Sequence, residues 1–285
     1  MKKVLALVVG LTLVVSLAAC DTEQETINLD YVNWAEGIAM NYLAEVILED
    51  EMGYNVESTE GDPGVVFTSI AQGDADFFVD AWFPVTHAQY MDEYEGEYED
   101  LGYNFTEAPI GLVVPDYVDI DSIAELNDHA EQFGNEIIGI DPGAGIMGAT
   151  EDAMDVYDLH DNFDLADLSD PVMVGALGTA IENEEWIVVT GWEPHYKFAD
   201  YDLKFLDDPE GVYGEPDNIH TISSLDAYEE HPEVVEFFEN MYFESEELAD
   251  LMGHFQEHGD DMTDQEIARD WKADNEDIWT AWLPE

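Results

Sequence analysis

The stretch DPGVVFTSIAQGDADFFVDAW, residues 62–82, predicts a helix that leads directly into a strand. Asp62 and Pro63 are typical of a helix start, and Gly73 is typical of a helix end. The run that follows, ADFFVDAW, is short and mostly apolar, as expected of a strand. Helices that alternate with strands are the units from which α/β proteins are built, so the stretch predicts an α/β fold.

Other parts of the chain repeat this alternation of strands and helices. The hydrophobic pattern predicts strands within residues 27–34, 55–60 and 201–208, a helix within 36–54, a strand, glycine-rich turn and helix across 135–157, and a strand followed by a loop across 184–198. The order of these elements indicates α/β architecture with largely parallel sheets.

Two extended stretches, residues 107–118 and 211–224, flank the middle region. We therefore expect two lobes that are joined by two crossings of the chain. The part from Asp226 onward is helical in composition and is expected to return to the first lobe. These boundaries place lobe 1 at residues 27–110 and 216–285, and lobe 2 at residues 111–215.

The first twenty residues are typical of a bacterial lipoprotein signal peptide. Lys2 and Lys3 open the chain, an apolar run follows, and LAAC ends at Cys20, the single cysteine of the protein. This pattern predicts cleavage before Cys20, lipidation of Cys20 and a polar linker over residues 21–26. An ordinary cleaved signal with an incidental cysteine is the alternative. With Cys20 lipidated, the chain has no cysteine left for a disulfide or a thiol nucleophile.

The composition is strongly acidic, with six basic and sixty-nine acidic residues and a formal net charge of −63. Nucleic acid and anionic lipid surfaces are poor partners for such a chain. The 46% hydrophobic content is nevertheless sufficient for a folded core. The acids occur along the whole chain after the leader rather than in one tail. They therefore indicate a surface adapted to high salt, as in proteins of halophiles, and we expect instability at low ionic strength.

A glycine-rich turn, GIDPGAGIMG at residues 139–148, lies between a predicted strand and a predicted helix. Such a turn places backbone N–H groups at a helix N-terminus, where an anion is favoured. The turn lacks the lysine of a phosphate-binding loop and the spacing of a dinucleotide fingerprint. A plain connection between strand and helix is an equally good interpretation of this stretch by itself.

Three tryptophans follow predicted strands, at the edge where open α/β sheets bind ligands. They are Trp34, Trp82 and Trp192. Converging aromatic rings form a cage for a quaternary ammonium group, although packing alone would also explain any one of them. The other tryptophans, which we assign to packing, are Trp186, Trp271, Trp279 and Trp282.

His87 lies about one helical turn beyond Trp82, near the same predicted sheet edge. From that position its imidazole could donate a hydrogen bond to a carboxylate. A lone histidine is more often structural or solvated, so the hypothesis depends on its proximity to the tryptophans.

The stretch HFQEH, residues 254–258, matches an inverted metalloprotease pattern through His254, Glu257 and His258. Gly253 and Gly259 flank it, so we expect a helix too short for a zinc site. The chain also lacks a Gly-x-Ser-x-Gly stretch, so we predict that the protein is not an enzyme and needs no metal or cofactor.

Five stretches together resemble the glycine betaine binding proteins of bacterial ABC importers. They occur in order over nearly the whole chain after the leader: VNWAEG, DAWFPVTH, GIDPGAGIM, TGWEPHYKF and IARDWKADNEDIWTAWL. The resemblance implies a type II periplasmic-binding-protein clamshell, with two lobes and two hinge crossings. It also implies a lipoprotein on the outer face of the membrane that captures glycine betaine and delivers it to permease and ATPase subunits for osmoprotection.

Carried over to this sequence, the resemblance makes Trp34, Trp82 and Trp192 the cage around the trimethylammonium group. His87 and the backbone N–H groups of Gly145 and Ile146 would hold the carboxylate. Tyr196 stands where the family often has tryptophan, so its side chain either packs or trims the pocket.

Several alternatives stay open at this point. Choline is the nearest rival ligand, and proline betaine, carnitine and ectoine also carry suitable chemistry. A secreted metal-dependent hydrolase that uses His254, Glu257 and His258 is the rival from another class. A lipoprotein that binds the solute for signalling is a third interpretation.

Overall fold

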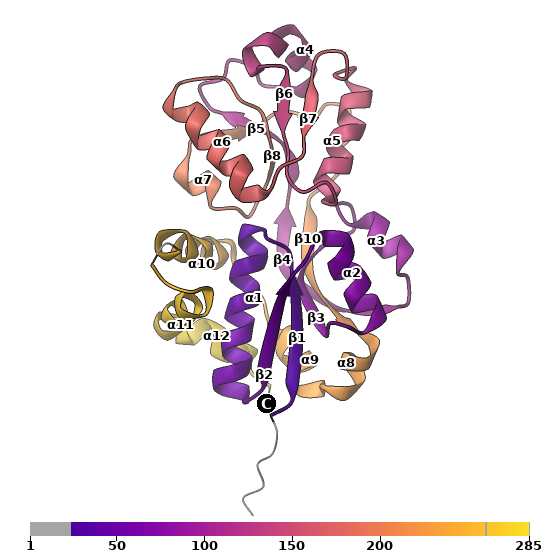
Figure 1. Ribbon diagram of the computed structural model, residues 1–285, viewed down its shortest axis with the longest axis vertical. Coiled ribbons are helices and arrows are strands. Elements are labelled where there is room, and N and C mark those ends of the chain that lie inside the picture. Colours follow the sequence, from indigo (N-terminus) through magenta and orange to yellow (C-terminus); the bar gives the residue numbers. More distant parts are fainter. Residues whose placement is uncertain (1–23, 260, 285) are drawn as a thin grey trace, which may run out of the picture.

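A computed structural model describes residues 24–259 and 261–284, and it has two sheets placed one above the other along the long axis (Figure 1). The predicted signal peptide, Cys20 and the start of the linker lie outside the described residues. Within the described part, none of the helices has the length and apolar character needed to cross a membrane.

The first sheet has the strand order β2-β1-β3-β10-β4. Its strands are β1 (Thr26–Tyr31), β2 (Asn55–Glu60), β3 (Phe77–Phe83), β4 (Tyr98–Ala108) and β10 (Asp217–Ser224). Every residue of β3 is buried, which explains its apolar sequence. We call this sheet, with the helices packed on it, the first lobe.

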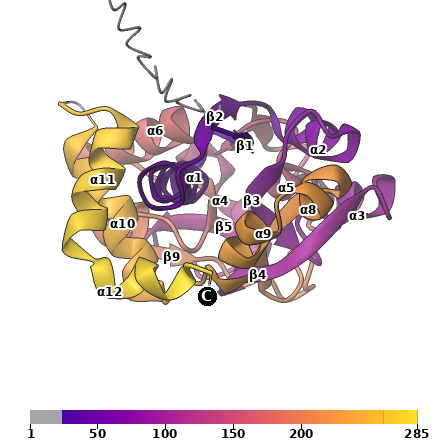
Figure 2. The same cartoon turned by 90° about the horizontal axis from the view of Figure 1, so that it is seen from below.

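Helices cover both faces of the first sheet (Figure 2). α1 (Ala35–Ile47), which continues as a π-helix over Leu48–Met52, packs on one face, with α10 (Ser245–His258) and α11 (Asp264–Asp274) outside it. α2 (Pro63–Gln72) packs on the other face and ends at Gly73, whose φ of 74° is left-handed, as the sequence predicted. The remaining helices here are α3 (Ala88–Glu93), α8 (Leu225–Glu230), α9 (Pro232–Asn240), α12 (Glu276–Trp279) and a 3-10 turn at Thr280–Trp282.

The second sheet has the strand order β7-β6-β8-β5-β9 and, with its helices, forms the second lobe. Its strands are β5 (Ile110–Pro115), β6 (Glu136–Ile138), β7 (Asp164–Ala166), β8 (Val189–Trp192) and β9 (Leu203–Phe205). Its longer helices are α5 (Gly145–Val156) and α6 (Asp170–Glu182). Shorter helical segments are Ile123–Glu125, α4 (Leu126–His129), Ala130–Phe133 and α7 (Lys197–Asp200).

The chain passes between the sheets twice, at Pro109 and again between β9 and β10. β4 leads out of the first sheet and β10 leads back into it, and the two strands pair antiparallel. In the second sheet, β5 likewise runs antiparallel to β8 and β9. The expectation of parallel pairing is confirmed for β1 with β2 and β3 and for β6 with β7 and β8. It is wrong for β10 and β5, which run antiparallel to their neighbours and make both sheets mixed, because strands that carry the chain out and back must run in opposite directions. Because β5 begins at Ile110 and pairs there with Trp192, we place the first lobe boundary at Pro109, just before the predicted 110/111. We keep 215/216 as the proposed second boundary.

Candidate ligand-binding site

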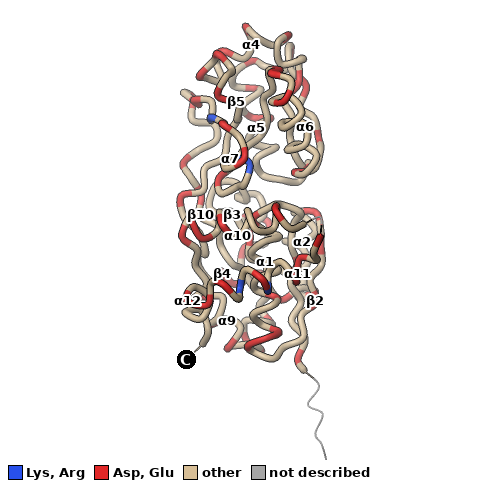
Figure 3. Tube along the Cα trace, turned by 90° about the vertical axis from the view of Figure 1, so that its left-hand side faces the viewer, with Lys and Arg blue, Asp and Glu red and all other residues tan. Residues whose placement is uncertain are grey.

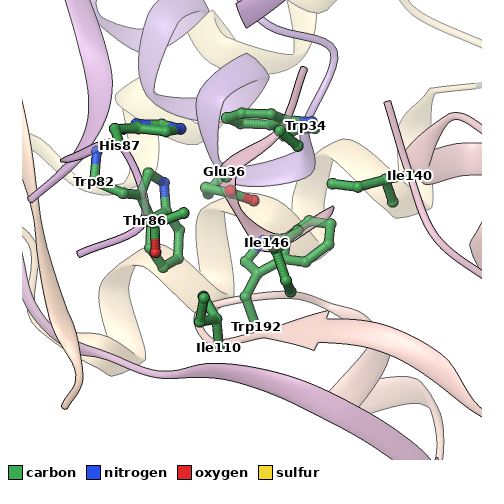
Figure 4. A pocket seen from close by; sticks show the side chains of 11 residues that line it. Trp34, Glu36, Trp82, Thr86, His87, Ile110, Ile140, Ile146 and Trp192 are labelled. Carbon is green, nitrogen blue, oxygen red and sulfur yellow. Dashed lines mark hydrogen bonds between the residues drawn. The ribbon is translucent and has the colours of Figure 1, made fainter. Parts of the chain in front are cut away.

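A small cavity lies between the two lobes (Figure 4). All six residues that the sequence singled out for the ligand line it: Trp34, Trp82, His87, Gly145, Ile146 and Trp192. Five further residues complete its wall, and the sequence reasoning had not named any of them as site residues: Glu36, Thr86, Ile110, Ile140 and Ala144. The tertiary structure thus brings together residues from five separate stretches of the chain.

The three tryptophan rings come from both lobes. Trp34 directly precedes α1, Trp82 lies near the end of β3, and Trp192 is the last residue of β8. Each ring is at most 4% exposed. Trp34 therefore follows its strand as predicted, whereas Trp82 and Trp192 still belong to theirs, and all three occur at the sheet edges that face the cavity (Figure 4).

Hydrogen bonds fix the geometry of Trp82 and His87 from within the same turn. The Trp82 indole Nε1–H donates to Asp80 Oδ1 at 2.7 Å. The Trp82 backbone N–H donates to His87 Nδ1 at 2.9 Å, and the His87 backbone N–H donates to the Trp82 carbonyl at 3.0 Å. Because Nδ1 accepts a hydrogen bond, a neutral His87 carries its proton on Nε2.

His87 thus offers a donor to the cavity. Its Nε2 atom is buried and has no hydrogen-bond partner among the described residues. Burial lowers the pKa of His87 to about 3, so the imidazole is neutral at physiological pH. The ring also stacks on Trp34, with centroids 5.8 Å apart and planes 20° from parallel, which holds the donor beside the aromatic wall.

The N-terminus of α5 forms the facing wall. Gly145 and Ile146 are its first two residues, and N–H groups at this position have no partner within the helix. A Cβ added to Gly145 would lie 1.7 Å from the carbonyl oxygen of Thr86, in the first lobe. Only glycine permits this approach of the two backbones. Tyr90 Oη also donates to the Gly143 carbonyl across the same junction, at 2.9 Å.

A buried carboxyl group lies in the wall near the tryptophans. Glu36, in the first turn of α1, is 1% exposed, and neither of its carboxyl oxygens has a hydrogen-bond partner among the described residues. Burial raises its pKa to about 8; the Trp192 side chain opposes this rise, and the charge of Asp170 adds to it. Burial also raises the pKa of Asp80, and Glu36 raises it further. The sequence reasoning missed Glu36, although its position two residues after Trp34 could have indicated it.

A second buried polar group lies behind Trp192, in the second lobe. His195 Nδ1 accepts from the Lys197 backbone N–H at 3.0 Å, and its Nε2–H faces both Asp170 oxygens at 3.1 Å. Burial lowers the pKa of His195 to about 4. Although burial alone would raise it, the pKa of Asp170 is lowered by His195 and Lys197, so this carboxylate is ionised. The sequence reasoning had not singled out this group.

The remaining aromatic residues pack elsewhere. Trp271, Trp279 and Trp282 are buried among the C-terminal helices, and Trp186 lies against Phe133, as the assignment to packing predicted. Tyr196 packs on the His195 ring with centroids 4.6 Å apart and does not line the cavity. The question left open for Tyr196 is thus answered in favour of packing.

The metalloprotease-like stretch does not form a metal site. The ring centroids of His254 and His258 are 4.5 Å apart. The His254 imidazole lies against the carboxylate of Asp270 instead of a third ligand. Across residues 24–259 and 261–284, no group of three or more histidine, cysteine, aspartate or glutamate side chains could hold a metal ion. The expectation of a very short helix is wrong: α10 runs through Gly253 to His258. A glycine costs a helix only about 1 kcal/mol.

Comparison with protein families gives a match over residues 25–274 to the family described as the substrate binding domain of ABC-type glycine betaine transport systems. Among curated proteins, the chain is 40% identical over 156 residues to the glycine betaine/carnitine transport binding protein GbuC of Listeria monocytogenes. That match spans 54% of this chain and 51% of the relative, so about half of each protein is compared.

Solved structures share the fold over nearly the whole chain. The glycine betaine, L-proline binding protein ProX of Borrelia burgdorferi has a TM-score of 0.87 and 32% identity, and the match covers 92% of this chain and 97% of ProX. Lactococcal OpuAC, closed on glycine betaine, has a TM-score of 0.84 and 33% identity, and the match covers 92% and 100%. These similarities confirm the two-lobed α/β clamshell of type II periplasmic binding proteins.

Proposed function

The chain belongs to the family of substrate-binding domains of ABC-type glycine betaine transport systems, and from this premise we propose that it captures glycine betaine, or a closely related betaine, between its lobes. The observation that carries the proposal is the set of chemical groups that line one cavity. Three tryptophan rings, a neutral imidazole with a free Nε2–H and a helix N-terminus surround the same cavity. These groups match a molecule with a quaternary ammonium at one end and a carboxylate at the other.

The ammonium group would lie among Trp34, Trp82 and Trp192. A methylated ammonium has no N–H to donate, so aromatic faces bind it better than hydrogen-bond acceptors do, and each desolvated face contributes on the order of 1–2 kcal/mol. The carboxyl group of Glu36 in the same wall supports a cation there, because an approaching positive charge favours the ionised form of a nearby carboxyl.

The carboxylate would lie against His87 Nε2–H and the N–H groups of Gly145 and Ile146. Such charge-assisted hydrogen bonds are roughly twice as strong as neutral ones, and the dipole of α5 adds to them. Choline ends in a hydroxyl and would leave at least one of these donors without a partner, at a cost of about 1–3 kcal/mol for each buried group. This difference favours betaine over choline.

Capture would be coupled to closure of the two lobes. Trp34, Trp82 and His87 belong to the first lobe, whereas Gly145, Ile146 and Trp192 belong to the second, so the wall is complete only when the lobes meet. A ligand that contacts both lobes therefore shifts the population towards the closed state. The closed protein would then dock on a permease driven by an ATPase. Identical X-ray scattering profiles with and without betaine would rule out this closure.

Substrate-binding proteins of ABC importers act outside the cytoplasm, and we propose that this one is tethered to the outer face of the membrane through a lipid on Cys20. The support is the leader sequence, in which two lysines and an apolar run end at LAAC. Replacement of Cys20 by Ala should release the protein from the membrane fraction, and retention of the variant there would contradict the tether.

We also propose adaptation to high salt. Acidic residues occur over both lobes, and lysine and arginine are sparse (Figure 3). At molar salt the Debye length falls to about 3 Å, so the repulsion among these carboxylates is screened. The melting temperature should therefore rise as potassium chloride increases from 0.1 M to 2 M, and a flat or falling curve would contradict the proposal.

The central test is isothermal titration of the mature protein in high salt, first with glycine betaine and then with choline, while tryptophan fluorescence is followed in parallel. Strong betaine binding with a change in fluorescence, and weaker choline binding, is the expected result. Circular dichroism should show that the sample is folded, because absence of binding by folded protein would refute betaine capture.

A further inference from the structure

We propose that Lys197, a residue that does not line the cavity, determines specificity by making the aromatic cage favour a zwitterion over a ligand with a net positive charge. The proposal rests on the proposed function, because it concerns the same cage and the same ligands. It assigns a role to a buried cation that the binding of betaine does not itself require.

The position of Lys197 is unusual for a lysine. Its side chain is 0% exposed, and its Nζ atom has no hydrogen-bond partner within the described part of the chain. Nζ lies 3.8 Å from the centroid of the Trp192 ring. Because Trp192 lines the cavity and Lys197 does not, we infer that the ammonium covers the ring face turned away from the ligand.

Burial and the neighbouring acidic groups act on the protonation of Lys197 in opposite directions. Burial lowers its pKa to about 7, whereas Asp170, Glu36 and Glu193 raise it. Asp170 is on α6, Glu36 is on α1 of the other lobe and Glu193 directly follows β8, so acidic groups face Lys197 from three elements. At pH 6 the ammonium form of Lys197 predominates, and at pH 8.5 the neutral amine does.

A cation on one face of an aromatic ring acts against a cation on the other face. A quaternary ammonium bound within about 6 Å of the Trp192 centroid would lie within roughly 10 Å of Nζ, and at that separation two like charges in a protein weaken binding by about ten-fold. Glycine betaine carries its own carboxylate, whose attraction to Lys197 offsets much of this repulsion. Choline and tetramethylammonium have no such compensation.

The test compares three ligands on the full mature protein by titration calorimetry at pH 6 in high salt, which screens exposed charges more than buried ones. The ligands are glycine betaine, choline and tetramethylammonium. The variant is Lys197→Met, which keeps an unbranched apolar side chain on Trp192 but removes the charge, with Lys197→Gln as a second variant. The matched control is Lys204→Met, because Lys204 is also in the second lobe but pairs with the exposed Asp121.

We expect both cations to bind Lys197→Met about ten-fold more strongly than they bind the wild type, with betaine changed by less than about three-fold. The control should resemble the wild type. The difference between variant and wild type should shrink at pH 8.5, where Lys197 has lost its proton. Because the charge of Lys197 lowers the pKa of Glu36, its removal also changes the titration of Glu36. The same comparison is therefore repeated with Glu36→Gln in both proteins, where a remaining difference belongs to Lys197.

Other results overturn the inference. If Lys197→Met lost affinity equally for all three ligands, Lys197 would only support the packing of Trp192. An unchanged ratio of cation to betaine affinity, or the same shift at both pH values, would exclude its charge as the cause. If the wild type binds betaine, these results refute the inference alone, whereas a folded wild type that binds none of the ligands refutes the proposed function and the inference with it.

Discussion

The two ends of the cavity are built in different ways. At the end proposed for the ligand carboxylate, which we call the carboxylate end, His87 is held by hydrogen bonds to Trp82, five residues away. There α5 presents its first N–H groups from a glycine that touches the other lobe. At the end proposed for the quaternary ammonium, which we call the ammonium end, Glu36 and Lys197 lie near the tryptophan rings. They come from different lobes, and their side chains have no hydrogen-bond partners within the described residues. One end is fixed by local hydrogen bonds, and the other depends on charges that meet only in the closed molecule.

The two ends also differ in how their charges respond to pH. A neutral imidazole with a pKa of about 3 keeps its donor at any pH at which the protein works. Glu36 and Lys197, with pKa values of about 8 and about 7, change charge near neutrality. We therefore expect the carboxylate end to set how tightly betaine is bound, and the ammonium end to set which cations compete with it.

The largest effect is expected from Gly145→Ala, which would place a methyl group against the Thr86 carbonyl. The methyl group would overlap a backbone atom, which cannot move aside without separating the two lobes. The closed state should therefore become rare, and betaine affinity should fall by about 100-fold or more. Gly148→Ala, on the same helix and with nothing within 4 Å of its added Cβ, is the matched control and should bind normally. Titration calorimetry checks both. Normal binding by Gly145→Ala would show that the carboxylate end does not need this approach of the lobes.

The next effect is expected from His87→Ala, which removes one donor to the carboxylate. Betaine affinity should fall by about 10- to 100-fold, the usual range for a hydrogen bond to a charged group, and choline affinity should fall less. His160→Ala, at an exposed position in the second lobe, is the control. Wild-type betaine affinity should not decrease between pH 8 and pH 5 through His87, because its pKa lies below that range. Equal losses for betaine and choline would contradict a carboxylate at this end.

The smallest effect is expected from Glu36→Gln. As Glu36 ionises between pH 6 and pH 8.5, its charge should attract the ammonium group and raise the betaine affinity of the wild type. Glu36→Gln should lose this rise and bind betaine a few-fold more weakly near pH 8.5. Glu57→Gln, at an exposed position on β2, should keep that rise. Calorimetry at the two pH values is the measurement, and an unchanged pH dependence would remove Glu36 from the ammonium end.

Glu36→Gln should also change stability in the opposite direction. The pKa of Glu36 is raised from 4.5 to about 8 in the folded protein, so its contribution is fully present below pH 4.5 and is lost as the pH rises towards 8. Glutamine has no charge to bury. Without ligand at pH 8.5, the variant should therefore have a free energy of unfolding that is higher than that of the wild type by on the order of 1–3 kcal/mol. Thermal unfolding should show this as a higher melting temperature, and the difference should be smaller at pH 5.

Much of the fold could be predicted because local patterns were strong. The helix at 63–72, with its Asp62 start and Gly73 end, and the strand at 55–60 agree with the structure closely. β4 was missed because its residues are largely polar or exposed, as in an edge strand. The antiparallel direction of β10 was missed because its pairing with β4 joins residues about a hundred positions apart or more, and no local pattern reports such a contact.

The sequence by itself determined the α/β class, the family and the six residues that meet at the cavity, since tryptophans, a histidine and a glycine-rich turn after strands are visible as local motifs. Only the tertiary structure decided what surrounds them. Glu36 and Lys197 look like ordinary surface charges in the sequence, and it is burial between two lobes that shifts their pKa values. Desolvation depends on the atoms packed around a group, and those atoms come from distant parts of the chain.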